Sequence, residues 1–412
     1  MLIEFRVANY RSIRDTQTLS MVAAKDRSHL DTNCIESGIA TIPHLTRSAV
    51  LYGPNASGKS NLIAALAFMR GMVENSATSI REGQTLDVVP FLLDPEKANQ
   101  PTEMEVTFIE NGIRYQYGFE LTAHRIIKEW LFVYNKRKAQ CWFSREYDEI
   151  TAQENWNLGS GLTGGRQRTV WKDATRANAL FLSAAINLNN EQLRPVFNWF
   201  VEKLTIIGNN EPIDPDFTIA HLKNELEKPK IIQFLKAADL GIVDVQVEMP
   251  VEKPAKTSDE IANKWKFHDI KFLHAGKNGD VGFGIDQESH GTRRLFSYAG
   301  LIYDALKKGH VMIIDELNSS LHPKLVYFLI ELMHNSKLNS NGAQLIFSTH
   351  ETALLDLDLF RRDQIWFIEK DHEQASRLYP LSDFSPRKNE ALVKGYLMGR
   401  YGALPSIKDL IY

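Results

Sequence analysis

Cysteine is scarce in this sequence. The 412 residues include only Cys34 and Cys141, which lie far apart and form neither a C-x-x-C pair nor a Cys/His spacing typical of metal sites. This pattern excludes a scaffold stapled by disulfides and predicts two free thiols in a reducing compartment.

Long apolar runs and an excess of one charge are also missing. No apolar stretch approaches the roughly 18 residues that a membrane span needs, and the first residues alternate between apolar and polar, which predicts a strand and not a signal peptide. The 48 Lys and Arg nearly balance the 51 Asp and Glu. This balance argues against a generally basic nucleic-acid coat, although a local basic patch stays open. We expect a cytoplasmic protein without membrane contact and leave DNA binding undecided.

Heptads do not persist over three or four cycles anywhere in residues 130–270, so the sequence encodes no long coiled-coil arm. Internal repeats and low-complexity tracts are absent as well. The length predicts two or three domains, and the 43% of hydrophobic residues can form a sizeable core.

What the sequence does contain is a phosphate-binding loop. Residues 53–60, GPNASGKS, fit the pattern G-x-x-x-x-G-K-[ST]. The apolar residues 48–52 before the loop predict a buried strand, and residues 61–75 after it predict a helix. This context is the one that the pattern requires, because backbone N–H groups of the loop and of the helix N-terminus form an anion site. It disfavours the alternative of an accidental glycine-rich turn.

The loop predicts particular contacts with ATP. Gly53 and Gly58 permit backbone conformations that a Cβ would forbid. Lys59 brings a positive charge to the β- and γ-phosphates, and Ser60 offers a hydroxyl ligand to Mg²⁺. The remaining loop residues and the next helical residue complete the predicted nucleotide-binding set: Pro54, Asn55, Ala56, Ser57 and Asn61.

Two acids and a histidine follow two further apolar runs. Asp315 and Glu316 directly follow the apolar residues 311–314, and His350 directly follows residues 344–349. An ionised carboxylate at the end of a buried strand usually binds a cation or a water molecule. We therefore assign Asp315 to the coordination of Mg²⁺ and Glu316 to the activation of the attacking water. His350 is assigned to the γ-phosphate end. Strand-end acids are common and such a histidine is usually structural, but the phosphate loop upstream favours catalysis.

Ser289 and Gly291 precede a predicted helix over residues 292–308. Serine and glycine at a helix N-terminus favour an anion site, and a simple helix cap is the alternative. A protein with one nucleotide pocket needs a second phosphate site only if that site serves a neighbouring subunit.

The other segments predict an antiparallel layer and a helical region. A hairpin is predicted at Asn111-Gly112, and Lys136-Arg137-Lys138 predict a solvated turn, with a nucleic-acid phosphate contact as the alternative. Predicted strands cover residues 102–110, 113–121, 125–134, 240–248, 266–274, 281–285, 364–369 and 376–381; predicted helices cover 173–204, 216–239 and 388–395; residues 24–46 form a polar excursion.

The order of these pieces resembles the ABC-type ATPase heads of the RecF, SMC and OLD branch. Residues 5–12, FRVANYRS, look like their opening strand and turn, and Arg11 matches the basic residue that reaches the nucleotide. In this resemblance, the segment 289–291 matches the signature motif, 315–316 the Walker B pair, 318–323 the D-loop and His350 the switch histidine. ESHGTRRLF, DELNSSLHPKL, FSTHE and KGYLMGRYGALP look more narrowly like compact bacterial ATPases of abortive-infection and anti-phage systems. The candidates for the Q-loop glutamine are Gln84, Gln100 and Gln116.

The resemblance implies an α/β fold, an ABC-type head with a mixed central sheet, an antiparallel β layer and an inserted helical lobe. The head would comprise residues 1–171 and 265–412, and the lobe residues 172–264. Two heads would sandwich two ATP molecules, so that Ser289 and Gly291 of one subunit meet the ATP held by the other. The implied catalytic residues are Lys59, Glu316 and His350.

Three functional classes compete. The first is an ATP-driven sensor of anti-phage defence, which controls a separate effector, a nuclease or toxin, on a phage-derived trigger. The second is a RecF/SMC-like ATPase of DNA repair or DNA structure, which would predict a basic surface or a long arm. The third, a transporter ATPase, is disfavoured because Ser-His-Gly departs from the Leu-Ser-Gly-Gly signature. We expect the first, because neither a basic surface nor a long arm is evident. We also expect the effector to be a separate protein, since the segment after His350 is too short to predict the nuclease domain of DNA-cutting OLD-type relatives.

Overall fold

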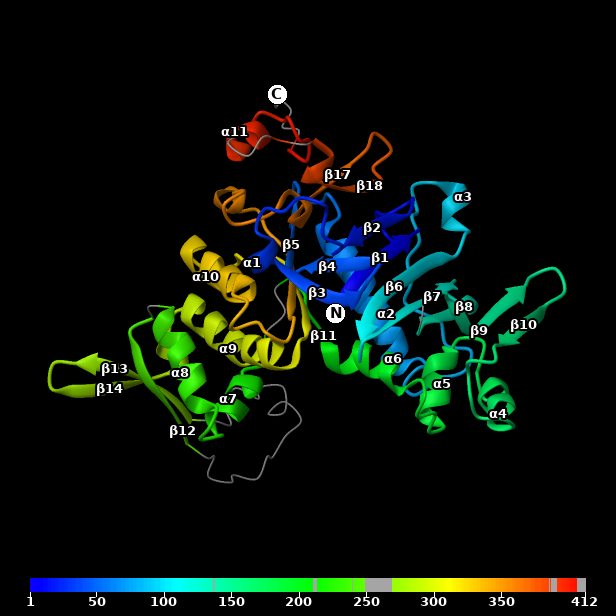
Figure 1. Cartoon of the computed structure of the whole chain (residues 1–412), viewed down its shortest axis with the longest axis horizontal. Helices are drawn as coiled ribbons and strands as arrows, with labels where there is room; N and C mark the ends of the chain where they lie inside the picture. The colour runs from blue at the N-terminus through cyan, green and yellow to red at the C-terminus, as the bar shows by residue number, and fades with distance from the viewer. Residues whose placement is uncertain are drawn as a thin grey trace.

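The centre of the computed structural model is a six-stranded sheet in the order β11-β15-β16-β5-β17-β18 (Figure 1). The structure describes residues 1–135, 138–209, 213–238, 240–248, 269–384, 386 and 391–405. The strands are β5 Ser48–Tyr52, β11 Leu204–Ile207, β15 Val311–Ile314, β16 Gln344–Ser348, β17 Ile365–Lys370 and β18 Ser376–Pro380. Every neighbouring pair is parallel except β17 with β18. The predicted mixed central sheet is therefore confirmed.

Strand β5 is buried on both faces. Ala49 and Leu51 belong to the core that contains α2 (Lys59–Asn75), whereas Val50 and Tyr52 belong to the core that contains α9 (His290–Lys308) and α10 (Pro323–His334). Successive side chains of a strand point to opposite faces, so a strand between two cores must be apolar throughout. This is why β5, β15 and β16 could be predicted from continuous apolar runs.

A seven-stranded antiparallel sheet shares the core of α2, in the order β10-β9-β8-β7-β6-β1-β2. Its strands are β1 Leu2–Ala8, β2 Gln17–Ser20, β6 Thr102–Glu110, β7 Ile113–Leu121, β8 Ile126–Tyr134, β9 Gln140–Asp148 and β10 Gln153–Leu158. The predicted hairpin at Asn111-Gly112 and the third strand are confirmed. Strands β9 and β10 were not predicted. Residues of β10 alternate only between exposed and half-buried, so this strand carries little apolar signal.

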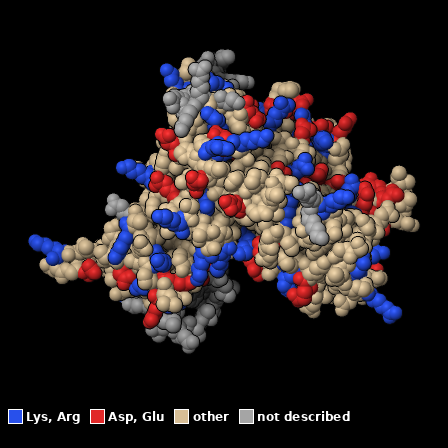
Figure 2. Space-filling model, in the orientation of Figure 1, with Lys and Arg blue, Asp and Glu red and all other residues tan. Residues whose placement is uncertain are grey.

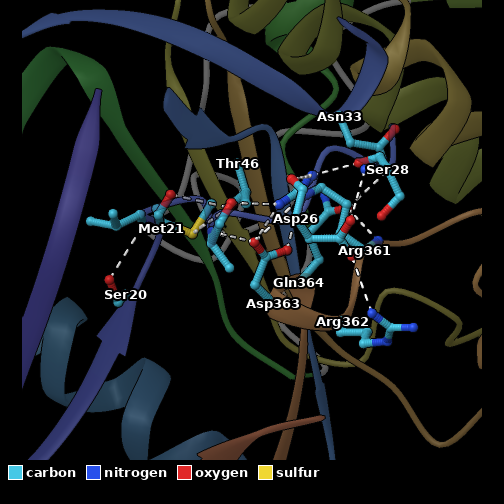
Figure 3. Close-up of polar contacts among 12 residues, drawn as sticks. Ser20, Met21, Asp26, Ser28, Asn33, Thr46, Arg361, Arg362, Asp363 and Gln364 are labelled. Carbon is cyan, nitrogen blue, oxygen red and sulfur yellow. Dashed lines mark hydrogen bonds and ion pairs between the residues drawn. The ribbon is translucent and has the colours of Figure 1, made fainter. Parts of the chain in front are cut away.

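The predicted polar excursion contains a short helix, α1 (Leu30–Asn33), and a hairpin of β3 (Cys34–Ile39) and β4 (Ile42–Thr46). Polar groups of this excursion interact with a residue far along the chain. Arg361 is 1% exposed, pairs with Asp363 at 2.8 Å and donates hydrogen bonds to the carbonyl oxygens of Asp26 and Ser28 (Figure 3). A local sequence pattern cannot reveal such a contact, which fixes the excursion against the segment after β16.

The chain from residue 180 to residue 207 packs into the head. Phe181 and Trp199 lie in the same core as α2, and β11 pairs in parallel with β15. The lobe boundary expected at residue 172 therefore does not coincide with a break in packing, because the helical pattern continues from one packing unit into the next. The helical elements of this part are α4 Gln167–Asp173, α5 Phe181–Asn187, α6 Arg194–Asn198 and a π-helix at Trp199–Lys203.

A second packing unit follows and lies to one side of the head in Figure 1. It consists of α7 (Asp216–Leu222), α8 (Lys228–Ala237) and the sheet of β12 (Ile242–Glu248), β13 (Asp269–Gly276) and β14 (Gly279–Gly284). Its apolar core closes on α9 through Phe296, so this unit mixes helix and sheet. Lys136 and Arg137 of the predicted solvated turn lie outside the described residues. No helix in the described part of the chain is both long and apolar enough to cross a bilayer.

Candidate nucleotide-binding site

The candidate site lies where β5, β16 and β15 end. These strands are parallel neighbours, and their register pairs Leu51 with Ser348 and Phe347 with Ile314. The phosphate loop, His350 and the acids Asp315 and Glu316 therefore follow strand ends at one edge of the sheet. Ligands of parallel α/β sheets bind outside the carboxyl ends of the strands.

The phosphate loop encloses the ammonium group of Lys59. Its Nζ donates hydrogen bonds to the carbonyl oxygens of Gly53 at 2.8 Å and Pro54 at 3.0 Å, and the residue is 6% exposed. Burial lowers the pKa of Lys59, while the carboxylates of Asp315 and Glu316 oppose this shift. A buried cation at the N-terminus of a 17-residue helix makes the loop suited to phosphate.

Two serines from distant segments, together with Asn61 directly after the loop, support the back of the loop. Ser376 Oγ donates to the carbonyl oxygen of Ser57 at 2.6 Å and lies at hydrogen-bond distance, 2.8 Å, from Ser12 Oγ. Asn61 Nδ2 donates to Ser12 Oγ at 2.7 Å. Sequence reasoning gave neither serine a role: Ser12 ends the segment FRVANYRS without being singled out, and no motif marks Ser376. They fix the loop to the β1–β2 turn and to β18.

Two features of the structure, its backbone angle and the lack of space for a side chain, require glycine at position 58. Its φ is 114°, and a Cβ added there would collide with Ser376 Oγ. We expect Gly58→Ala to weaken ATP binding about tenfold or more and to lower the melting temperature, because the loop must move to relieve the collision. Calorimetric titration with ATP and thermal unfolding measure both effects. The control is Gly83→Ala, where φ is 74° but no atom lies within 4 Å of the added Cβ; equal ATP affinity in the two variants would contradict this account.

Arg11 lies on the turn after β1, with a φ of 50°. Its backbone N–H donates to the carbonyl oxygen of Val89 at 2.8 Å, and its guanidinium lies 5.2 Å from the centroid of the Tyr10 ring. Since the next residue, Ser12, contacts Asn61, this turn adjoins the start of α2. Arg11 is exposed and is thus placed beside the phosphate loop.

The two acids are held in different ways. Asp315 is 3% exposed and accepts a hydrogen bond from Ser348 Oγ. Glu316 has a φ of 52°, and its Oε1 lies 3.6 Å from Nε2 of His350. Burial lowers the pKa of His350, as does the charge of Lys59, while Glu316 opposes the shift. The imidazole is therefore neutral at neutral pH, and it faces Glu316.

The donors at this edge fit a magnesium site. Ser60 exposes its side chain directly after Lys59, and Asp315 adds a carboxylate. Mg²⁺ prefers oxygen ligands and is commonly bound by one or two protein groups together with substrate phosphates and water. This small donor set therefore suits Mg²⁺ carried by a nucleotide.

Ser289 and Gly291 begin α9, away from these acids in the chain. Ser289 Oγ caps the helix by accepting a hydrogen bond from the N–H of Thr292 at 3.0 Å. A Cβ on Gly291 would lie 2.8 Å from the carbonyl oxygen of Ser320, so only glycine lets the helix start pack closely on the D-loop. The D-loop in turn joins the switch strand, because Asn318 Oδ1 accepts a hydrogen bond from Thr349 Oγ1 at 2.9 Å.

The three candidate Q-loop glutamines are engaged elsewhere. Gln84 accepts a hydrogen bond from Arg81, Gln100 from Lys97, and Gln116 bonds within the antiparallel sheet. The end of β11 is instead beside Asp315, because the N–H of Asp315 donates to the carbonyl oxygen of Ile207 at 2.9 Å. Asn209, two residues on, is exposed there. No local motif distinguishes Asn209 in the sequence.

A family model described as "AAA domain, putative AbiEii toxin, Type IV TA system" matches residues 48–356, well over half of the chain. The chain belongs to this family. The matched region begins at β5 and includes the phosphate loop, residues 289–291, Asp315, Glu316 and His350. This match supports the ATPase resemblance that the order of the motifs indicated. No curated protein matches the sequence.

The comparison with solved structures also found similar chains, two of which are SMC heads. The SMC head domain from Thermotoga maritima is 14% identical with a TM-score of 0.42, covering 92% of this chain and 98% of that one. The SMC head bound to the C-terminal winged-helix domain of ScpA is 12% identical with a TM-score of 0.42, covering 92% of this chain and 97% of that one.

Proposed function

We propose that this chain binds and hydrolyses ATP between two heads, and that closure of the head dimer controls a separate effector in bacterial anti-phage defence. The observation that carries the proposal is a continuous set of contacts. The signature start packs on Ser320, Asn318 bonds Thr349, and the neighbouring His350 faces Glu316. Within one subunit, these contacts connect the start of α9 to Glu316. If α9 binds the γ-phosphate of an ATP held by the other subunit, the contacts would transmit that binding to the acids of the subunit to which α9 belongs.

In this proposal each residue of the site in one head has a distinct role. Lys59 and the loop N–H groups hold the β- and γ-phosphates, and Glu316 orients the attacking water and accepts its proton. Ser60 and Asp315 would hold Mg²⁺, which when bound would neutralise charge on the phosphates. His350, neutral beside Glu316, contacts the γ-phosphate end. Ser289 and Gly291 of the second subunit complete the site with the N-terminus of a 19-residue helix.

The proposed output is a separate protein, a nuclease or toxin, held by the closed or assembled form and released on a phage-derived trigger. The family description, which names a toxin of a toxin–antitoxin system, supports this context. Hydrolysis across a closing dimer supplies a switch, and a switch needs an output to stop a phage. Figure 2 shows Lys and Arg interspersed with Asp and Glu on the viewed face, which fits a protein partner better than a nucleic-acid coat.

The test is to purify this chain alone and to incubate it with ATP, with Mg²⁺ or Mn²⁺, and with DNA or RNA. We expect ATP to be hydrolysed and the nucleic acid to stay intact. Lys59→Ala serves as the control that assigns the hydrolysis to this site. Nucleic-acid cleavage that survives further purification and disappears with a substitution in this chain would show that the effector is built in. Hydrolysis that depends strongly on DNA would favour the DNA-repair alternative.

A further inference from the structure

We propose that Ser348 is a positioning residue that sets the orientation of both Walker B acids. The inference rests on the proposed ATPase function and extends it to a residue that does not itself touch the nucleotide. Ser348 is the last residue of β16, is 0% exposed and stands two residues before His350.

A single hydroxyl group contacts both acids. Ser348 Oγ donates a hydrogen bond to Oδ1 of Asp315, and it accepts one from the backbone N–H of Glu316 at 2.7 Å. The donor and acceptor capacity of the hydroxyl are thus used toward adjacent residues of the neighbouring strand. With Oδ1 engaged by Ser348, the other oxygen of Asp315 would be the one available to Mg²⁺.

The second hydrogen bond holds an unusual backbone. Glu316 has a φ of 52°, a left-handed conformation that residues with a Cβ rarely adopt. This conformation turns the chain at the end of β15, and the N–H of Leu317 then donates to the carbonyl oxygen of Ser348 at 3.1 Å. Ser348 therefore accepts hydrogen bonds from the backbone N–H groups of Glu316, through its hydroxyl, and of Leu317, through its carbonyl. These two contacts hold the backbone on either side of the Glu316 side chain.

A buried serine could instead serve packing alone, so a matched control is needed. Ser183 is 2% exposed and its Oγ donates to the carbonyl oxygen of Val73 at 2.6 Å, near the far end of α2. Ser183→Ala removes a buried, hydrogen-bonded hydroxyl without touching the Walker B acids. Ser348→Thr restores the hydroxyl that Ser348→Ala removes.

The experiment measures ATP turnover, its dependence on Mg²⁺ concentration, and the rise in melting temperature that Mg²⁺ adds to that given by ATP with EDTA. Removing a group that orients a metal ligand typically costs about 10–100-fold in metal affinity or activity. We expect Ser348→Ala to lower kcat by about this factor, to raise the Mg²⁺ concentration for half-maximal turnover, and to leave ATP binding in EDTA unchanged because Lys59 is intact. Ser348→Thr should recover most of the loss, and Ser183→Ala should stay within about twofold of wild type.

Two results would overturn the inference. One is a Ser348→Ala protein whose turnover and Mg²⁺ dependence match those of Ser183→Ala. The other is a folded Ser348→Thr protein as impaired as Ser348→Ala, which would show that the hydroxyl is not the relevant group. If the wild-type protein binds ATP without hydrolysing it, the proposed function fails, and the Mg²⁺-dependent melting shift of the same variants still decides the role of Ser348.

Discussion

Lys59→Ala is expected to abolish ATP binding. Lys59 is the cation enclosed by the phosphate loop, with its Nζ within 3.0 Å of two loop carbonyl oxygens. Charge-assisted hydrogen bonds to phosphate are about twice as strong as neutral ones, and they are stronger still in a buried site. We expect the affinity for ATP to fall at least about a hundredfold, measured by calorimetric titration.

The control for this variant is Lys230→Ala, which removes an exposed lysine of α8 and should leave the affinity for ATP unchanged. Circular dichroism and thermal unfolding establish that both variants are folded. A folded Lys59→Ala protein that binds ATP with near wild-type affinity would show that the nucleotide site lies elsewhere.

Glu316→Gln is expected to separate ATP binding from hydrolysis. The amide keeps the shape of the side chain but cannot accept the proton of the attacking water, and general-base catalysis typically contributes about 10²–10⁴-fold. Lys59, Ser60 and Asp315 are unchanged, so ATP should bind as in wild type. Phosphate release measures the loss of turnover, and calorimetry measures the retained affinity.

Glu331→Gln is the matched control, because Glu331 is exposed on α10 and has no place in the site. Its turnover should equal that of wild type. If Glu316→Gln also hydrolysed ATP at the wild-type rate, another group would have to be the base. A joint loss of ATP binding and turnover would instead mean that Glu316 acts in holding the nucleotide.

The local parts of the site could be predicted from the sequence because each is a short, continuous pattern. The run from β5 through Gly58 into α2 carries its own strand, loop and helix signals. The ends of β15 and β16 are marked by polar residues after four buried apolar positions in β15 and three in β16. Parallel pairing of these strands then brings Asp315 and His350 to the edge that holds the phosphate loop.

The contacts that support the site could not be predicted, because they join segments far apart in the chain. Ser376 lies more than 300 positions after Ser57 and Ser12, and Arg361 is similarly remote from the carbonyls of residues 26 and 28. Serine and arginine are common in exposed loops, so their local sequence gives no sign of burial. The continuous helical pattern after residue 172 likewise concealed that its first part packs into the head.

The measurement that tests the central claim most directly is light scattering of Glu316→Gln with and without ATP and Mg²⁺. Because this variant should hold ATP without consuming it, we predict an ATP-dependent increase in mass to a dimer or larger assembly. Adding Ser289→Arg should abolish the increase, since a bulky cation at the start of α9 blocks the γ-phosphate of the other subunit. A mass that is the same with and without ATP in both variants would contradict the ATP-sandwiched dimer.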